Sequence, residues 1–154
     1  SCRDMECSMG NVVADAMVDR VKDQGVTIAI QNGGGLRASI DAGPVSMGEV
    51  LSVLPFQNTL ATFELKGSDV VAALESGLGK IEEGAGRFPQ VSGLSYTFDQ
   101  SKPAGERVSD VMVKAGDAYA PIDADKMYGV ATNNSMRGDG DGYSIFATAV
   151  VTAY

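Results

Sequence analysis

The sequence of 154 residues contains no histidine. Catalytic zinc and dinuclear hydrolase centres usually hold their metal ions with imidazole nitrogens, and serine or cysteine nucleophiles usually need an imidazole base. We therefore expect no catalytic residue and no metal site within this chain.

Positive charge is also scarce, with 12 Lys and Arg residues against 20 Asp and Glu residues and a formal net charge of −8. Such a chain has no excess of cations to neutralise a phosphate backbone, so we expect no binding to nucleic acid. A small anionic ligand would have to be held by a few local arginines.

Long apolar runs are missing as well. None approaches the roughly 20 residues of a membrane-spanning helix, and the segment order of a signal peptide is absent, so we expect no membrane span. The chain opens at Ser1-Cys2 without a leader. We therefore expect the chain to be an excised part or a processed product of a longer protein.

The residues that are present suit one globular domain, 1–154, because 44% of them are hydrophobic and the chain is long enough to bury a core. Capping, turn and periodicity signals predict helices at about 8–24, 46–54 and 67–78 and strands at about 26–30, 59–66, 94–98, 108–114 and 127–132. Helices interspersed with strands, followed by a strand-rich second half, indicate the α+β class with a mixed β-sheet and packed helices.

A glycine-rich stretch, Gln31-Asn32-Gly33-Gly34-Gly35-Leu36-Arg37, follows the first predicted strand. Consecutive glycines let the backbone take positive φ angles and approach a ligand closely, while Asn32 and Arg37 add an amide and a fixed cation. The stretch matches neither a P-loop nor a dinucleotide fingerprint. It predicts a site for an anion or a polar heterocycle, and the alternative is a simple connection without a ligand.

Two cysteines, Cys2 and Cys7, flank Arg3 near the start of the chain. Their spacing is too wide for a C-x-x-C redox motif, and no partners complete a zinc site. A short disulfide loop is one interpretation and two reduced thiols are the other. A bond would stabilise the fold by only about 2 kcal/mol, but it would fix the shape of the Arg3 loop and would imply an oxidising compartment.

Asp and Gly alternate at Asp139-Gly140-Asp141-Gly142, as they do at the start of a calcium-binding EF-hand loop. Tyr143 stands at the third ligand position, however, and no Glu closes a 12-residue loop. We therefore expect no calcium site here.

Five segments occur in order along the chain: Cys2-Arg3-x-x-Glu6-Cys7-x-Met9-Gly10-Asn11, Asn32-Gly33-Gly34-Gly35-Leu36-Arg37, Leu54-Pro55-Phe56, Lys66-Gly67-Ser68 and Gly140-Asp141-Gly142-Tyr143. Together they resemble the C-terminal domain of the 5'-nucleotidase family, over nearly the whole chain. In that family a separate N-terminal metallophosphatase domain holds two divalent metal ions, and the C-terminal domain binds the nucleotide or nucleoside substrate.

The resemblance implies that this chain is the substrate-binding domain of a secreted or periplasmic 5'-nucleotidase. The metal-binding N-terminal domain of the same protein, which this chain lacks, would be its partner, and the domain itself would need no cofactor. Alone, the chain should therefore be inactive as a phosphatase. The location implied is periplasmic or extracellular.

The same resemblance implies a set of substrate-binding residues: Arg3, Asn32, Gly34, Gly35, Arg37, Phe56 and Asp141. Asn32 would contact the base, Arg37 the phosphate or ribose side, and Arg3 would be a second cation near the phosphates. Asp141 would accept hydrogen bonds from the ribose hydroxyls.

One position departs from the family pattern, in which two aromatic rings stack on the nucleobase. Phe56 matches the first ring, but Ser135 stands where the second is usual, six residues before Asp141. A stacking contact contributes roughly 1 to 3 kcal/mol per base, so the base preference stays open. Two alternatives therefore remain: a structural domain of a related metallophosphatase that acts on a non-nucleotide ester, and a stand-alone nucleotide-binding module.

Overall fold

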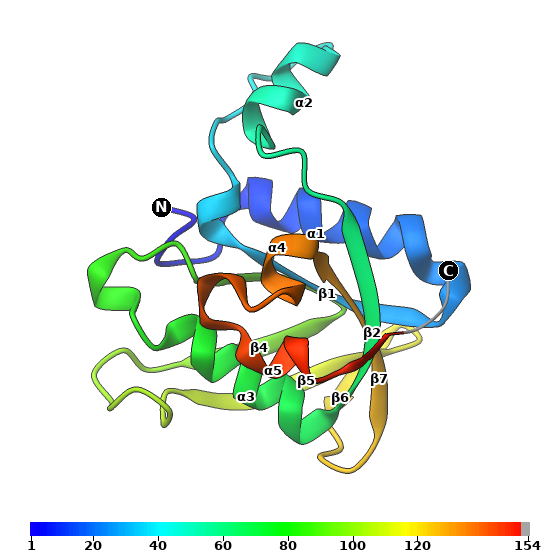
Figure 1. Cartoon of the computed structure of the whole chain (residues 1–154), viewed down its shortest axis with the longest axis vertical. Helices are drawn as coiled ribbons and strands as arrows, with labels where there is room; N and C mark the ends of the chain where they lie inside the picture. The colour runs from blue at the N-terminus through cyan, green and yellow to red at the C-terminus, as the bar shows by residue number, and fades with distance from the viewer. Residues whose placement is uncertain (152–154) are drawn as a thin grey trace.

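A five-stranded mixed sheet forms the centre of the protein, whose residues 1–151 are described by a computed structural model (Figure 1). Its strand order is β3 (Pro89–Ser92), β1 (Val26–Asn32), β7 (Met127–Asn133), β2 (Leu60–Lys66) and β8 (Val150–Val151). Strands β1 and β7 run parallel, and the other neighbours are antiparallel. A second, antiparallel sheet contains β4 (Leu94–Phe98), β5 (Val108–Ala115) and β6 (Ala118–Pro121). The predicted α+β class with a mixed sheet is confirmed.

Helices cover both faces of the large sheet (Figure 1). Helix α1 (Ser8–Val21) packs on one face through a small cluster around Ala14 and Ala29. The other face carries the main core, to which α3 (Gly67–Leu78), α4 (Asn134–Arg137), α5 (Ser144–Ala147) and the second sheet contribute. Only α2 (Met47–Val53) stands clear of both sheets in this view.

Burial on both faces explains the apolar run of β1. Ile28 and Ile30 point into the main core, whereas Ala29 between them faces α1, and all three are fully buried or nearly so. A strand covered on both sides has no polar face, so it appears in the sequence as a continuous apolar run.

Several element boundaries differ from the sequence-based expectation. Helix α1 ends at Val21, and a short 3-10 turn, Lys22–Gln24, leads to Gly25 at φ 77°. Its N-cap is Cys7, whose sulfur accepts a hydrogen bond from the Gly10 amide, because Ser8 is already helical. Strands β3, β6 and β8 were not predicted, since each has only two to four residues and lies at the edge of its sheet.

Candidate functional site

One cavity of about 470 Å³ lies where segments distant in sequence converge. Its lining residues are Arg3, Asn32, Gly34, Gly35, Arg37, Phe56, Asn58, Ala85, Gly86, Ser135 and Asp141. All seven residues of the predicted substrate-binding set are among them, together with Ser135. Asn58, Ala85 and Gly86 were not predicted, because no local motif marks the loop before β3 or the residue after Gln57.

The glycine stretch forms part of the wall of this cavity. The expectation that its glycines take positive φ angles was wrong. Gly33–Gly35 form a 3-10 turn at the end of β1, and none of the three has a positive φ. A β-carbon on Gly33 would lie 1.8 Å from the carbonyl oxygen of Cys2, and one on Gly35 would lie 2.4 Å from Nε2 of Gln31. Glycine is required here because the N-terminal loop and a neighbouring side chain press against the turn.

The amide of Asn32 is oriented by three hydrogen bonds. Its Nδ2 donates to Oδ2 of Asp141 at 2.6 Å, and its Oδ1 accepts from Nε2 of Gln31 at 3.2 Å and from Nδ2 of Asn133 at 2.9 Å. One N–H of Asn32 therefore remains for a ligand. Asp141 itself has a left-handed backbone, φ 55°, which aspartate tolerates better than most residues.

Tyr143 anchors the turn that carries Asp141. Its ring is completely buried and stacks on Phe146 with 5.1 Å between the centroids, and its hydroxyl donates to the carbonyl oxygen of Arg87 at 2.6 Å. Burial, followed by the nearby Tyr96 and Asp141, raises the pKa of Tyr143 well above its usual range. The phenol thus stays protonated and keeps this bond, so Tyr143 has a structural role.

Two arginines supply positive charge to the cavity. Nη1 of Arg3 donates to the carbonyl oxygen of Gly84 at 3.0 Å, and the guanidinium of Arg37 lies 5.9 Å from the ring centre of Phe56. Within residues 1–151 neither arginine forms an ion pair. Both charges are therefore available to an anion.

The loop that carries Arg3 is fixed by a disulfide and by a buried glutamine. Cys2 and Cys7 are bonded in the structure, with 5.2 Å between their α-carbons. Gln90, 1% exposed, donates from Nε2 to the carbonyl oxygens of Cys2 at 3.0 Å and Met5 at 2.8 Å, and its Oε1 accepts from the Cys7 amide at 3.2 Å. Sequence reasoning missed Gln90, because no local pattern identifies a single polar residue that binds a loop more than 80 positions away.

Phe56 and Ser135, the positions that the resemblance relates to base stacking, both line the cavity. Phe56 is 60% exposed and precedes Gln57, whose φ of 55° is unusual for a residue other than glycine. Ser135 is also exposed, in the first turn of α4. The cavity thus offers one aromatic face and one hydroxyl where the family pattern has two rings.

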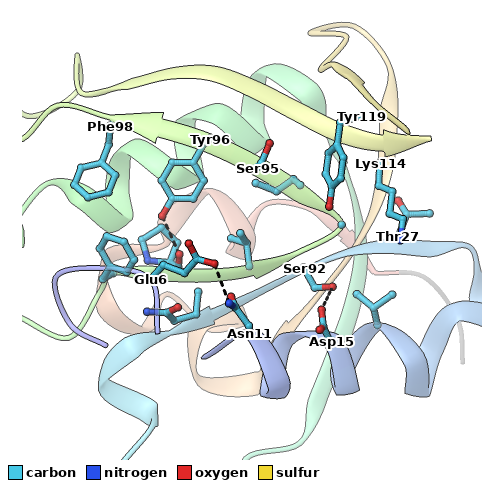
Figure 2. A pocket seen from close by; sticks show the side chains of 17 residues that line it. Glu6, Asn11, Asp15, Thr27, Ser92, Ser95, Tyr96, Phe98, Lys114 and Tyr119 are labelled. Atoms are coloured by element: carbon cyan, nitrogen blue, oxygen red, sulfur yellow. Dashed lines mark hydrogen bonds between the residues drawn. The ribbon is translucent and has the colours of Figure 1, made fainter. Parts of the chain in front are cut away.

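A larger cavity of about 510 Å³ lies elsewhere, between α1 with β3 and the second sheet (Figure 2). Its carboxylates are already paired, since Asn11 donates to Glu6 at 2.8 Å and Ser92 donates to Asp15 at 2.7 Å. No residue of the predicted substrate-binding set lines it. The smaller cavity is therefore the better candidate for an anionic ligand.

Residues 1–151 hold neither a cluster of metal ligands nor a membrane-spanning helix. No group of three or more His, Cys, Asp or Glu side chains there is placed to hold a metal ion. Nor is any helix in that part of the chain long and apolar enough to cross a bilayer.

Comparison with known proteins assigns the chain to a family of domains. The family model described as "5'-nucleotidase, C-terminal domain" matches residues 1–148. A trifunctional nucleotide phosphoesterase protein of Bacillus subtilis, YfkN, is 47% identical over 150 residues, which is 96% of this chain and 10% of that protein. The human 5'-nucleotidase is 33% identical over 159 residues, with 94% of this chain and 28% of that protein covered.

A solved structure agrees with the sequence matches. The 5'-nucleotidase precursor of Thermus thermophilus superimposes with a TM-score of 0.95 at 46% identity, covering 99% of this chain and 30% of that one. This chain thus spans less than a third of the length of these three relatives.

Proposed function

The chain belongs to the 5'-nucleotidase family as its C-terminal domain, and on that basis we propose that it binds the substrate of a longer, metal-dependent nucleotide phosphohydrolase. The cavity carries this proposal. Four separate segments of the chain bring two unpaired arginines, an exposed aromatic ring and a carboxylate to one cavity of about 470 Å³. A nucleotide has an anionic phosphate, a flat base and a diol, so it offers one complementary group to each of them.

We assign the roles accordingly. Arg3 and Arg37 bind the phosphate, since arginine donates well-directed hydrogen bonds to phosphate oxygens. Phe56 stacks on one face of the base, and Asp141 accepts hydrogen bonds from the ribose hydroxyls. Asn32 holds Asp141 in place and offers its remaining N–H to the base. Gly34 and Gly35 allow the ligand to approach the backbone.

In this proposal the hydrolytic step uses metal-binding groups that the described residues do not supply. With no histidine in the sequence and no cluster of metal ligands in residues 1–151, the two expected divalent ions would be held by the metallophosphatase domain of the longer protein. That domain is the proposed partner.

We place the protein outside the cytoplasm, in the periplasm or extracellular space. The Cys2–Cys7 bond fits an oxidising compartment. Relatives of the chain include 5'-nucleotidases of snake venom, among them that of Naja atra at 33% identity.

Ser135 supports a second candidate function. Because this residue lines the cavity without an aromatic ring, the site could serve a metallophosphatase whose ester is not a nucleotide, with this chain as a structural domain. A stand-alone nucleotide-binding module is the third possibility, since the chain alone carries the whole cavity.

Calorimetric titration of AMP and adenosine into the isolated chain distinguishes the proposed function from the structural domain. We expect both to bind, with AMP tighter by at least about tenfold, because a hydrogen bond to a charged group contributes about 1.5 to 3 kcal/mol. Binding of neither ligand would overturn the proposal and favour the structural domain. Fusing the chain to the metal-binding part of a relative then tests the third possibility. If the chain is a stand-alone module, the fusion should hydrolyse AMP no faster than the metal-binding part alone.

A further inference from the structure

Residues 36–58 form an arm that leaves the body of the domain after Gly35 and returns just before β2 (Figure 1). Every hydrogen bond that the structure shows for residues 38–57 closes within the arm or at its base. Examples are the capping box between Ser46 and Glu49 and the bond from the Ser52 hydroxyl to the Gly48 carbonyl. Among the residues that the structure describes, the arm is thus hydrogen-bonded to nothing beyond its base, where Val53 is buried.

The helix of this arm, α2, presents an apolar face to solvent. Met47, Val50 and Leu51 are 71%, 38% and 49% exposed, and their i, i+3, i+4 spacing places them on one side of the helix. Val45, just before the helix, is also exposed. Of the nine exposed large hydrophobic side chains among the described residues, four lie on α2 or just before it, which is more than the usual scatter of single exposed apolar residues.

An apolar face on so short a helix needs a packing partner. Helix α2 has seven residues, whereas isolated helices below roughly 12 to 15 residues are only marginally formed in water. The capping box does not replace the stabilisation that a helix gains by burying its apolar face. In the part of the chain that the structure describes, nothing covers this face.

The position of the arm indicates what covers it. Arg37 and Phe56, close to its two ends, both line the candidate cavity, so a body resting on α2 would come to the mouth of that cavity. In the proposed function the phosphate lies at Arg3 and Arg37 in this cavity, so the catalytic groups of the second domain have to reach the same mouth. A second copy of this chain would cover the apolar face but would bring no such groups.

We propose that the apolar face of α2 is the surface on which the metal-binding domain of the longer protein docks when it reaches the bound substrate. This rests on the proposed function, which supplies the second domain. The arm then has two roles. Its ends bind the substrate through Arg37 and Phe56, and its helix positions the partner domain over the phosphate.

Amide hydrogen exchange tests the docking without any nucleotide. The chain alone is compared with a joined protein, in which the chain replaces the matching 30% of the Thermus thermophilus relative. We expect the amides of residues 47–53 to exchange at least about tenfold more slowly in the joined protein. The double variant Met47→Glu/Leu51→Glu should abolish that difference. The control Val12→Glu, at a 62% exposed position on α1, should preserve it.

Equal exchange of these amides in the chain alone and in the joined protein would overturn the docking proposal. A dimer of the chain alone that Met47→Glu/Leu51→Glu dissociates in sedimentation would overturn it too, because the covering body would then be a second copy. AMP binding to the chain alone should change by less than about twofold in this double variant, since neither position lines the cavity. Absence of AMP binding to the parent chain would refute the proposed function, whereas the exchange result is obtained without nucleotide, so the two failures are distinguishable.

Discussion

Asn32 and Asp141, which are 109 positions apart, share a hydrogen bond of 2.6 Å inside the candidate cavity. The bond joins the end of β1 to the turn after α4, and it holds the carboxylate of Asp141 at the cavity wall. Because Asp141 also has a positive φ, its position depends on this partner as well as on the buried Tyr143 beside it.

Asp141→Asn should weaken AMP and adenosine by a similar factor of about 5 to 10. The ribose diol, which both ligands share, would lose a charged acceptor and keep a neutral one, a difference of about 1 kcal/mol. Calorimetric titration of both ligands measures this. Asp139→Asn is the matched control, because Asp139 also has a positive φ, 79°, but is exposed and does not line the cavity. A loss confined to AMP would mean that Asp141 does not face the ribose.

Gln90→Leu should lower the free energy of unfolding by about 1 to 3 kcal/mol. It leaves the amide of Cys7 and the carbonyls of Cys2 and Met5 without their buried partner, and water can reach only some of them. Chemical denaturation measures the loss, and Gln100→Leu at an exposed position is the control. A loss below about 0.5 kcal/mol would show that the N-terminal loop does not depend on Gln90.

Gln90 also illustrates which parts of the molecule sequence reasoning could not reach. Its three bonds connect positions 83 to 88 residues apart, and nothing in the neighbouring residues of Gln90 announces them. The same holds for Gly33, where glycine was expected for its φ angle but is required by the carbonyl of Cys2, a contact known only after folding.

Elements with local signals were predicted well. The helix predicted at about 46–54 is present as α2, which begins with a capping box between Ser46 and Glu49, and the strand predicted at about 59–66 is present as β2, Leu60–Lys66. The short edge strands were missed, because two to four residues carry too little periodicity to distinguish a strand from a loop. The seven residues that line one cavity were selected through the family resemblance, since no pattern within the chain relates residue 3 to residue 141.

Cys2 and Cys7 should be bonded to each other in protein folded under oxidising conditions. Mass spectrometry with and without reduction measures this, and two free thiols would count against both the bond and the proposed location. The double variant Cys2→Ser/Cys7→Ser should lose about 2 kcal/mol of stability. It should also weaken AMP more than adenosine, because the disulfide loop carries Arg3 into the cavity. Equal weakening of both ligands would separate Arg3 from the phosphate.

Arg37→Ala and Phe56→Ala should have different effects on the two ligands. Arg37→Ala should weaken AMP by roughly ten- to a hundredfold and adenosine far less, since a hydrogen bond to a charged group contributes about 1.5 to 3 kcal/mol. Phe56→Ala should weaken both about equally, because both ligands carry the base. The ratio of the two affinities is the measurement. If removal of Arg37 costs AMP and adenosine the same, the phosphate lies elsewhere.

Ser135→Phe should tighten AMP and adenosine together if the cavity is a nucleotide site with one stacking face. Ser135 is exposed and lines the same cavity as Phe56, so an added ring has room and reaches solvent on its outer side. An added aromatic pair contributes about 0.5 to 1.5 kcal/mol, or roughly two- to tenfold in affinity. Ser135→Leu is the control, because it adds apolar bulk without a ring and should give less than half of that gain in free energy. If the phenylalanine leaves both affinities unchanged while Phe56→Ala also has no effect, the base does not enter between positions 56 and 135. The non-nucleotide ester would then become the better account of the cavity, with Arg3 and Arg37 still facing its anionic group.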